Sequence, residues 1–366
     1  MQAAAENPTP AEPRQTQPVT AVDSPQRNSA EQPRRSSEMI HQPVIDSHDH
    51  DLHHRGYTAR TVLTNDGVGL SVRDYGRSDA AHTVVLLHGF CLTGMAWDLQ
   101  IRHLRRQWGE QVRIISYDHR GHGDSAAAPI GTYRIEQLAA DLAEVLAALD
   151  VSGPVTLAGH SMGGMTALAY LGRHRSQRPI NPAALILVST AAGRLGERGL
   201  GHLLASPGPR LLYGLVRHTP QPFTDDVIRL LVQPICKAVT RLGGYGSTAK
   251  DALVTVSAAA INDTPLATKV GFLPALQTYD QYGTLASIEA STTVISGGAD
   301  RLTPPEHGRD LAAGIPNARL LHRPTAGHML LHEAPQLVSA AISASIARTA
   351  PTRPLTQPRR RLAVVQ

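Results

Sequence analysis

The sequence is poor in aromatic residues, lysine and cysteine, and it contains no long apolar run. Aromatic side chains make up 4% of the 366 residues, and the two cysteines are Cys91 and Cys236. Because two cysteines cannot form a disulfide framework, we expect a reducing, cytoplasmic location. No uninterrupted apolar run approaches the ~18 residues of a membrane span, and the N-terminus lacks the apolar block of a signal peptide. We therefore expect no integral membrane segment.

Lysine is so rare that arginine supplies nearly all of the positive charge. The formal net charge is +5, with 35 basic and 30 acidic residues. Several arginines cluster among prolines near the C-terminus, at Arg353, Arg359, Arg360 and Arg361. A weak electrostatic tether to an anionic surface is one interpretation of this segment, and a basic, disordered tail is the preferred one. The charge pattern predicts no nucleic-acid surface.

The N-terminal segment, residues 1–55, is predicted to be a disordered tail. It is dominated by Pro, Gln, Ser, Glu and Ala, which bury too little apolar surface to offset the entropy lost on ordering. Residues 41–54 are rich in histidine and aspartate, which are metal-ligand types. A solvated linker is the preferred interpretation of that stretch, and adventitious zinc or nickel binding is the alternative. No dedicated metal site is predicted.

Between the tails, apolar runs alternate with helical patterns. An opening hairpin is predicted around the turn Asn65-Asp66-Gly67, and Ile135 to Leu149 carries the clearest helical stripe. Further strands are predicted at residues 83–87, 112–117, 155–158, 184–188, 293–295 and 318–321. This alternation predicts an α/β fold, with a mainly parallel sheet covered by helices on both faces.

The segment 193–270 interrupts this alternation. It shows helical stretches separated by prolines and glycines, and no strand pattern. We interpret it as a helical cap inserted into a core formed by residues 56–192 and 271–349, with residues 350–366 as the C-terminal tail.

The stretch Leu157-Ala-Gly-His-Ser-Met-Gly-Gly164 lies between a predicted strand and a predicted helix. A Gly-x-Ser-x-Gly sequence in that setting is typical of a nucleophile elbow. Gly159 and Gly163 would remove bulk beside the tight turn that lifts Ser161 clear of the sheet. The sequence therefore predicts Ser161 as a nucleophile, at a helix N-terminus that favours developing negative charge. The alternative is a plain glycine-rich turn.

Two backbone amides are predicted to stabilise that charge. Phe90 follows His88-Gly89 after a buried strand, and Met162 follows Ser161. His88 is interpreted as a buried structural histidine in preference to a catalytic base. Cys91 is interpreted as a small buried residue in preference to a nucleophile.

Two later loops each follow a predicted strand and carry the other candidate catalytic residues. Asp300 lies in Ser296-Gly-Gly-Ala-Asp300 and can orient an imidazole. His328 lies in Gly327-His328 and can take the proton of Ser161, whereas His332 is the weaker candidate because it falls on the following helix. The order Ser161, Asp300, His328 is the serine–acid–histidine order of one α/β architecture.

The stretch Tyr117-Asp118-His-Arg-Gly-His-Gly-Asp-Ser125 is dense in polar residues. We interpret it as a hydrogen-bonded loop that buttresses the site, with Asp118 and Ser125 satisfying backbone amides, in preference to a catalytic loop.

These motifs together resemble the α/β-hydrolase superfamily over roughly Tyr57 to Ala347. Within it the chain is similar to the esterase, monoglyceride-lipase, C–C-hydrolase and cofactor-free haloperoxidase groups. The resemblance implies an eight-stranded, mostly parallel sheet with a cap over a Ser161–Asp300–His328 triad. The long N-terminal tail and the cap depart from any one of these groups.

The sequence predicts a serine hydrolase that cleaves a small hydrophobic ester or acyl compound without a cofactor. Phe272 and Leu273, at the base of the predicted cap, are the candidate substrate-binding residues, although cap packing explains them equally well. Gly243-Gly-Tyr-Gly246 lacks the preceding strand and the spacing of a phosphate-binding loop. Carbon–carbon bond hydrolase, perhydrolase, acyltransferase and non-catalytic receptor stay open as alternatives.

Overall fold

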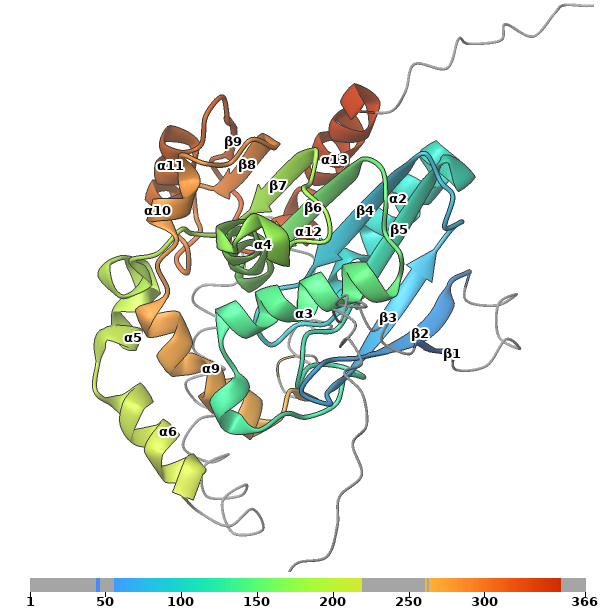
Figure 1. The fold of residues 1–366 in the computed structure, drawn as a ribbon. Helices are drawn as coiled ribbons and strands as arrows, with labels where there is room; N and C mark the ends of the chain where they lie inside the picture. Colours follow the sequence, from blue (N-terminus) through green and yellow to red (C-terminus); the bar gives the residue numbers. More distant parts are fainter. Residues whose placement is uncertain (1–43, 47–55, 219–260, 262, 350–366) are drawn as a thin grey trace, which may run out of the picture. The chain divides into compact units, whose positions relative to one another are not determined.

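A sheet of nine strands runs through the described part of the chain, which in this computed structural model comprises residues 44–46, 56–218, 261 and 263–349 (Figure 1). Strands β1 to β3 and β5 pair antiparallel in that order, and the sheet is parallel from β5 to β9. The spatial order is β1 (Val44–Asp46), β2 (Thr58–Leu63), β3 (Gly69–Tyr75), β5 (Val112–Tyr117), β4 (His82–Leu87), β6 (Val155–His160), β7 (Ala184–Val188), β8 (Ser291–Gly297) and β9 (Arg319–Arg323).

The eight strands expected from the sequence are β2 to β9, and the mostly parallel sheet is confirmed. The ninth strand, β1, is a correction, because it falls in the segment 1–55 that was expected to be a tail. Val44 pairs with Val62 and Ile45 with Thr61. Three residues are too few to show a strand period, so the sequence pattern could not reveal this pairing.

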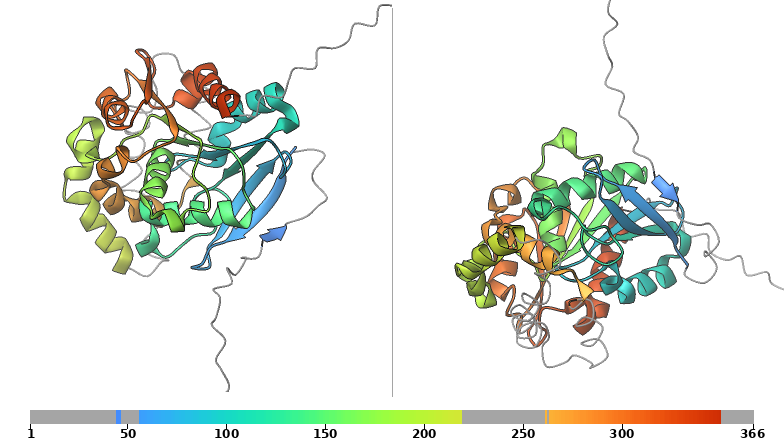
Figure 2. Two further views of the ribbon diagram at one scale, coloured as in Figure 1. Left: turned by 45° about the horizontal axis from the view of Figure 1, so that its top comes forward. Right: turned by 90° about the horizontal axis from the view of Figure 1, so that it is seen from below.

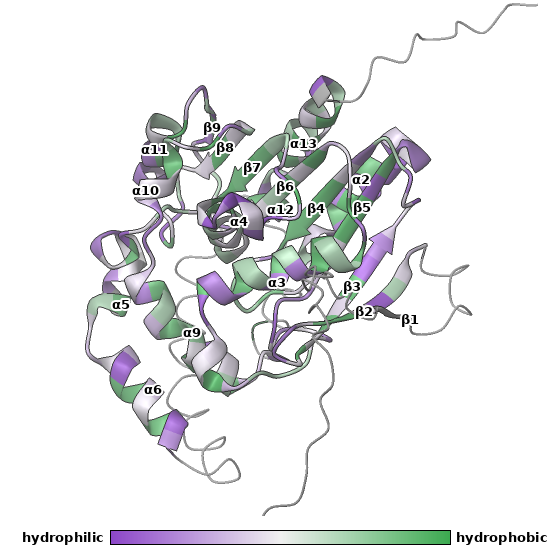
Figure 3. Ribbon diagram, viewed as in Figure 1, coloured by the Kyte–Doolittle hydropathy of each residue, from purple (hydrophilic) through white to green (hydrophobic). Residues whose placement is uncertain are grey.

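The central strands divide their apolar side chains between two cores, one on each face of the sheet. On β4, Val85 and Leu87 belong to one cluster, and Val84 and Leu86 belong to the other. The first cluster includes α3 (Ile135–Ala148) and α4 (Met162–Gly172), and the second includes α2 (Asp98–Trp108) and α13 (Pro335–Thr349). Both faces are therefore covered by helices, which explains the continuous apolar runs of the central strands (Figure 3).

The remaining helices are shorter or lie to one side of the sheet. The α-helices are α5 (His202–Ala205), α6 (Gly208–His218), α9 (Leu266–Thr278), α10 (Tyr282–Leu285), α11 (Pro305–Gly314) and α12 (Leu330–Glu333). The single 3-10 turns are η1 (Gly94–Trp97), η2 (Gly109–Gln111), η3 (Ile130–Thr132), η4 (Arg175–Gln177), η5 (Leu195–Glu197) and η6 (Gly199–Gly201).

Helices α5 and α6 occupy the described part of the segment expected to be a cap. They lie at the side of the sheet away from β2 and β3 (Figure 2). The side chain of Gln277 joins both helices to α9, because it accepts from Arg210 Nε (2.9 Å) and donates to the Leu204 carbonyl (2.7 Å). Helix α9 runs through residue 270, so the boundary expected there falls inside a helix. The rest of the segment expected to be a cap, residues 219–260 and 262, lies outside the described residues.

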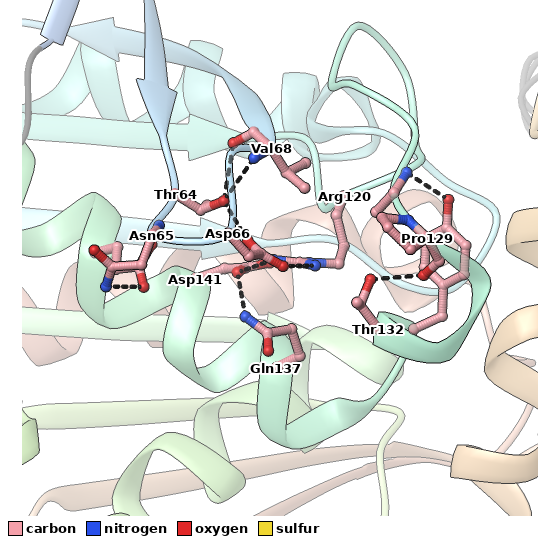
Figure 4. A network of polar contacts seen from close by, with 12 residues as sticks. Thr64, Asn65, Asp66, Val68, Arg120, Pro129, Thr132, Gln137 and Asp141 are labelled. Carbon is pink, nitrogen blue, oxygen red and sulfur yellow. Dashed lines mark hydrogen bonds and ion pairs between the residues drawn. The ribbon is translucent and has the colours of Figure 1, made fainter. Parts of the chain in front are cut away.

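Arg120, in the loop after β5, joins the β2–β3 turn to α3 (Figure 4). Its guanidinium donates to both oxygens of Asp141 (2.7 and 2.6 Å) and to both oxygens of Asp66 (2.8 and 3.0 Å). Thr64 and Gln137 donate to the same two carboxylates. The side chains of Arg120 and Asp141 have no exposed surface. Burial raises the pKa of the Asp141 carboxyl, and the hydrogen bonds from Arg120 oppose that effect.

Replacing Arg120 with methionine should therefore lower the free energy of unfolding by about 3–5 kcal/mol, because Asp141 would stay buried without its cation. Urea denaturation measures the loss. The matched control is Arg175→Met, which removes an ion pair between exposed side chains, Arg175 and Glu289. The control should lose no more than about 1 kcal/mol, and equal losses in the two variants would contradict this role of Arg120.

Candidate active site

Ser161 stands between β6 and α4 in a conformation that few side chains adopt. Its backbone angles are φ 51° and ψ −119°. A positive φ at a residue other than glycine costs about 1–3 kcal/mol and persists only where the surroundings enforce it. The Ser161 amide donates to the Val188 carbonyl (2.9 Å), and the Thr190 hydroxyl donates to the Ser161 carbonyl (2.7 Å). The sharp strand-to-helix turn expected at this position is present.

Neither Gly159 nor Gly163 has room for a side chain of its own. A Cβ on Gly159 would lie 2.5 Å from backbone atoms of Gly163 and Gly164. A Cβ on Gly163 would collide with the carbonyl groups of Leu87 and His88 at the end of β4. The start of α4 therefore lies directly against the β4 strand end.

Asp300 and His328 meet across the loops that follow β8 and β9. His328 Nδ1 lies 2.9 Å from Asp300 Oδ2, and both side chains are buried. Asp300 also accepts from the amides of Leu302 and Thr303 (each 2.9 Å) and from the Thr303 hydroxyl (2.8 Å). A carboxylate so placed keeps the proton of His328 on Nδ1, which leaves the Nε2 lone pair to act as a base.

His160, the residue before Ser161, connects these loops to the elbow. Its Nε2 lies 3.0 Å from the His328 carbonyl, which can only accept, so Nε2 carries the proton. Burial lowers the pKa of His160 to about 3, so the ring is neutral. A Cβ on Gly89 would lie 2.8 Å from His160 Nδ1 and 3.2 Å from Ser161 Cβ. The segments carrying Gly89, Ser161 and His328 therefore converge on one place.

Sequence reasoning did not single out His160. The sequence places this histidine at the end of a strand buried on both faces, but its bond to the His328 carbonyl joins residues far apart in the chain and leaves no local signal. The competing histidine, His332, lies on α12 with its Nε2 3.3 Å from the Ala96 carbonyl. Of the two histidines considered as the base, His328 is the one paired with Asp300.

Phe90 lies in the loop after β4, whose Gly89 approaches Ser161, and Met162 follows Ser161 at the start of α4. Met162 is the first residue of its helix, so its amide has no acceptor within that helix. In the ranges that the structure describes, neither amide donates to another group of the chain. Two such donors beside a serine can hold a developing oxyanion.

The loop after β5 supports the site, as expected. Asp118 accepts from the amides of Gly94 (2.7 Å) and Asp124 (3.0 Å) and pairs with Arg73. The Ser125 hydroxyl donates to the Asp118 carbonyl (2.6 Å). His88 and Cys91 are both buried, which agrees with their structural interpretation.

The two residues expected to bind substrate differ in their surroundings. Phe272 has no exposed surface, and its ring packs against those of Phe90, His122 and Tyr133 at centroid distances of 6.0, 5.7 and 5.1 Å. It therefore packs against Phe90 from within the core, which fits the packing interpretation, and a role of Phe272 in substrate binding stays a prediction. Leu273, the next residue on α9, is partly exposed.

Within the described ranges, no group of three or more His, Cys, Asp or Glu side chains is arranged to hold a metal ion. Of the residues rich in histidine and aspartate at 41–54, the structure describes residues 44–46 alone. The helices over the same described ranges are all too short or too polar to cross a bilayer.

A family model described as alpha/beta hydrolase fold matches residues 82–335, which is more than half of the chain. The chain belongs to the α/β-hydrolase family. The AB hydrolase superfamily protein YisY of Bacillus subtilis is 27% identical over 285 residues, covering 77% of this chain and 97% of that protein. A non-heme chloroperoxidase of Kitasatospora aureofaciens is 38% identical over 115 residues, covering 31% of this chain and 39% of that enzyme.

Similarity to solved structures of an esterase and another hydrolase supports this assignment. A thermophilic esterase from Thermogutta terrifontis aligns with a TM-score of 0.61 and 25% identity, covering 80% of this chain and 100% of its own. A hydrolase from Pseudomonas aeruginosa aligns with a TM-score of 0.61 and 26% identity, covering 79% and 98%. This α/β hydrolase is therefore similar to esterases and other hydrolases over most of its described length.

Adding one methyl group at Gly163 should disrupt the elbow. Gly163→Ala would push α4 away from the carbonyls of Leu87 and His88, and overpacking of this kind costs about 1–3 kcal/mol. The control is Gly131→Ala in η3, where a Cβ would meet nothing within 4 Å. Thermal unfolding and labelling of Ser161 by a fluorophosphonate measure the effect. A Gly163→Ala variant as stable and reactive as Gly131→Ala would contradict the close approach.

The buried neutral histidines should make the fold sensitive to acid. Burial lowers the pKa of His122 to about 4, so the unfolded chain binds a proton that the folded chain does not bind between about pH 6.5 and pH 4. The free energy of unfolding should therefore fall as the pH falls through that window, by about 3 kcal/mol from His122 alone.

Urea denaturation between pH 7 and pH 4 measures this loss, which His122→Gln should reduce. The control is His103→Gln, because His103 is exposed on α2 and little changes around its ring on unfolding. If the pH dependence of His122→Gln equals that of the unmodified protein, the buried ring is not the source.

Proposed function

We propose that this protein is a serine hydrolase that cleaves carboxylic esters through an acyl-enzyme on Ser161. The observation that supports this most directly is the buried pair of His328 and Asp300, held beside the serine elbow by His160. A nucleophile, a base and a residue that orients the base are the elements that such catalysis needs.

The proposed reaction has two halves. His328 Nε2 takes the proton of the Ser161 hydroxyl as Oγ attacks the substrate carbonyl carbon, and the amides of Phe90 and Met162 stabilise the oxyanion. The intermediate collapses, the bond to the alcohol breaks, and His328 returns the proton to the leaving oxygen. Water then attacks the acyl-enzyme in the same way, which releases the carboxylic acid and restores Ser161.

The proposed substrate is a small hydrophobic ester. Apolar side chains of α6 and the partly exposed Leu273 of α9 support it, as does the similarity to esterases at 25% identity. No cofactor enters these steps, and a cytoplasmic location stays a prediction from the two cysteines.

A perhydrolase activity is the second candidate, because the chain matches non-heme chloroperoxidases at up to 38% identity over about a third of its length. The same triad would then pass the acyl group to hydrogen peroxide, and the product would be a peracid. Comparing the rates of acid and peracid formation from one ester, with and without peroxide, separates the two activities.

The test of the proposed function compares the unmodified protein with Ser161→Ala, using short p-nitrophenyl esters and a fluorophosphonate probe. The unmodified protein should hydrolyse the ester and carry the label, and Ser161→Ala should do neither. His328→Ala should also abolish turnover, whereas the control His332→Ala should leave kcat within about threefold, because Asp300 pairs with His328 and the His332 ring lies against the Ala96 carbonyl.

Label that persists in Ser161→Ala would show that another residue is the nucleophile. An unmodified protein that neither turns over the ester nor takes the label would overturn the proposal. Labelling without turnover of any ester would favour the binding protein that the sequence left open.

A further inference from the structure

Three buried histidines lie beneath the loop that carries Phe90. We call His88, His119 and His122 the histidine cluster. Their ring centroids lie 4.3 to 6.4 Å apart, and none of the three has exposed surface. Burial lowers the pKa of each ring, so all three are neutral at pH 7.

The cluster bonds to successive peptide units of the Phe90 loop. His119 Nε2 donates to the His88 carbonyl (3.1 Å), and His88 Nδ1 donates to the Gly89 carbonyl (2.8 Å). The Cys91 amide donates to His122 Nε2 (3.1 Å). Each peptide unit from residue 88 to residue 91 therefore has an imidazole as a hydrogen-bond partner.

These contacts fix the direction of the Phe90 amide. A trans peptide is planar, with its C=O and N–H pointing in opposite directions. Because the Gly89 carbonyl points at His88, the Phe90 N–H of the same peptide points away from His88. The next residue, Cys91, holds a φ of 58°, which the loop would not keep without an anchor.

His122 provides that anchor through one defined tautomer. Its Nδ1 lies 3.0 Å from the Arg120 carbonyl, so Nδ1 carries the proton and Nε2 is free to accept from Cys91. A protonated His122 could not accept this bond. The charged groups that act on the ring are Asp118, which favours its protonation, and Lys269, which opposes it.

Phe272 holds His122 and Phe90 together from the opposite side. The centroid of its ring lies 5.7 Å from that of His122 and 6.0 Å from that of Phe90, and the centroids of the Phe90 and His122 rings are 6.2 Å apart. The ring of His122 is therefore fixed by a hydrogen bond at each nitrogen and by an aromatic contact on α9.

We propose that His122 is a positioning residue for catalysis, which holds the Cys91 amide and so orients the Phe90 amide toward the oxyanion. This inference rests on the proposed function, because it assigns a role within the same reaction. The role needs the neutral, accepting form of the ring, which neither a phenylalanine nor an asparagine at this position can reproduce.

The test measures kcat and KM for a p-nitrophenyl ester in variants of His122. In His122→Phe an aromatic ring is kept and both hydrogen bonds are lost, so kcat should fall about 10- to 100-fold while KM changes little. In His122→Gln the side-chain oxygen can accept from Cys91, so kcat should recover at least in part. If His122→Phe does not fold, His122→Asn replaces it, because its amide keeps a donor for Arg120.

The matched control is His82→Gln, at the opposite end of β4. His82 is also buried, and its Nε2 lies 2.9 Å from the Thr156 hydroxyl. This variant should lose stability and keep its kcat. A variant of His122 that loses stability to the same degree but keeps its kcat would overturn the proposal, because His122 would then be structural only.

Hydrogen exchange distinguishes failure of this inference from failure of the proposed function. The Cys91 amide should exchange slowly in the unmodified protein, faster in His122→Phe, and slowly again in His122→Gln. If the unmodified protein hydrolyses no ester, the proposed function fails, and this exchange pattern still supports the anchoring of the loop by His122. Equal exchange in all three proteins would overturn it.

Discussion

The positive φ of Ser161 is the constraint on which the rest of the site depends. This conformation is costly for a serine, and it persists because the segments around it allow no other. Gly163 lets α4 approach the β4 strand end, and Val188 and Thr190, at and just after the end of β7, bond to the serine backbone. Since parallel strands end at one edge of the sheet, the loops after β4, β6, β8 and β9 are brought to the same place without further adjustment.

Neutral imidazoles satisfy backbone groups around this serine. His88, His119, His122 and His160 are all buried, and each donates a hydrogen bond to a backbone carbonyl. Such a ring holds a loop in one orientation before any substrate arrives, which is the preorganisation that oxyanion stabilisation requires. At low pH these rings destabilise the fold, because protonating any of them would leave a positive charge buried in the core.

Much of this arrangement could be predicted from sequence because its signals are local. The turn at residues 65–67 predicted β2 and β3, and continuous apolar runs predicted β4 to β9. The spacing of Gly159, Ser161 and Gly163 predicted the elbow. The roles of His122 and His160 could not be predicted in this way. A sequence pattern does not distinguish a buried histidine from other core residues. Its role depends on the carbonyl that fixes its tautomer, which belongs to Arg120 in the same loop for His122 and to the distant His328 for His160. Strand β1 was missed because its pairing with β2 depends on contacts that the pattern of a three-residue segment does not reveal.

Helix α9 contacts both the loop that carries Phe90 and the helices α5 and α6 at the side of the sheet. Its Phe272 packs on Phe90 and His122, and one and a half turns later Gln277 bonds to Arg210 and Leu204. Pro274 lies between them inside the helix, where it removes the amide that would bond the Val270 carbonyl and so weakens the helix at this point. If a change in α5 or α6 displaces Gln277, the helix can therefore bend at Pro274, and the displacement need not extend to Phe272. Side chains of α5 and α6 can vary while the geometry around Ser161 is kept.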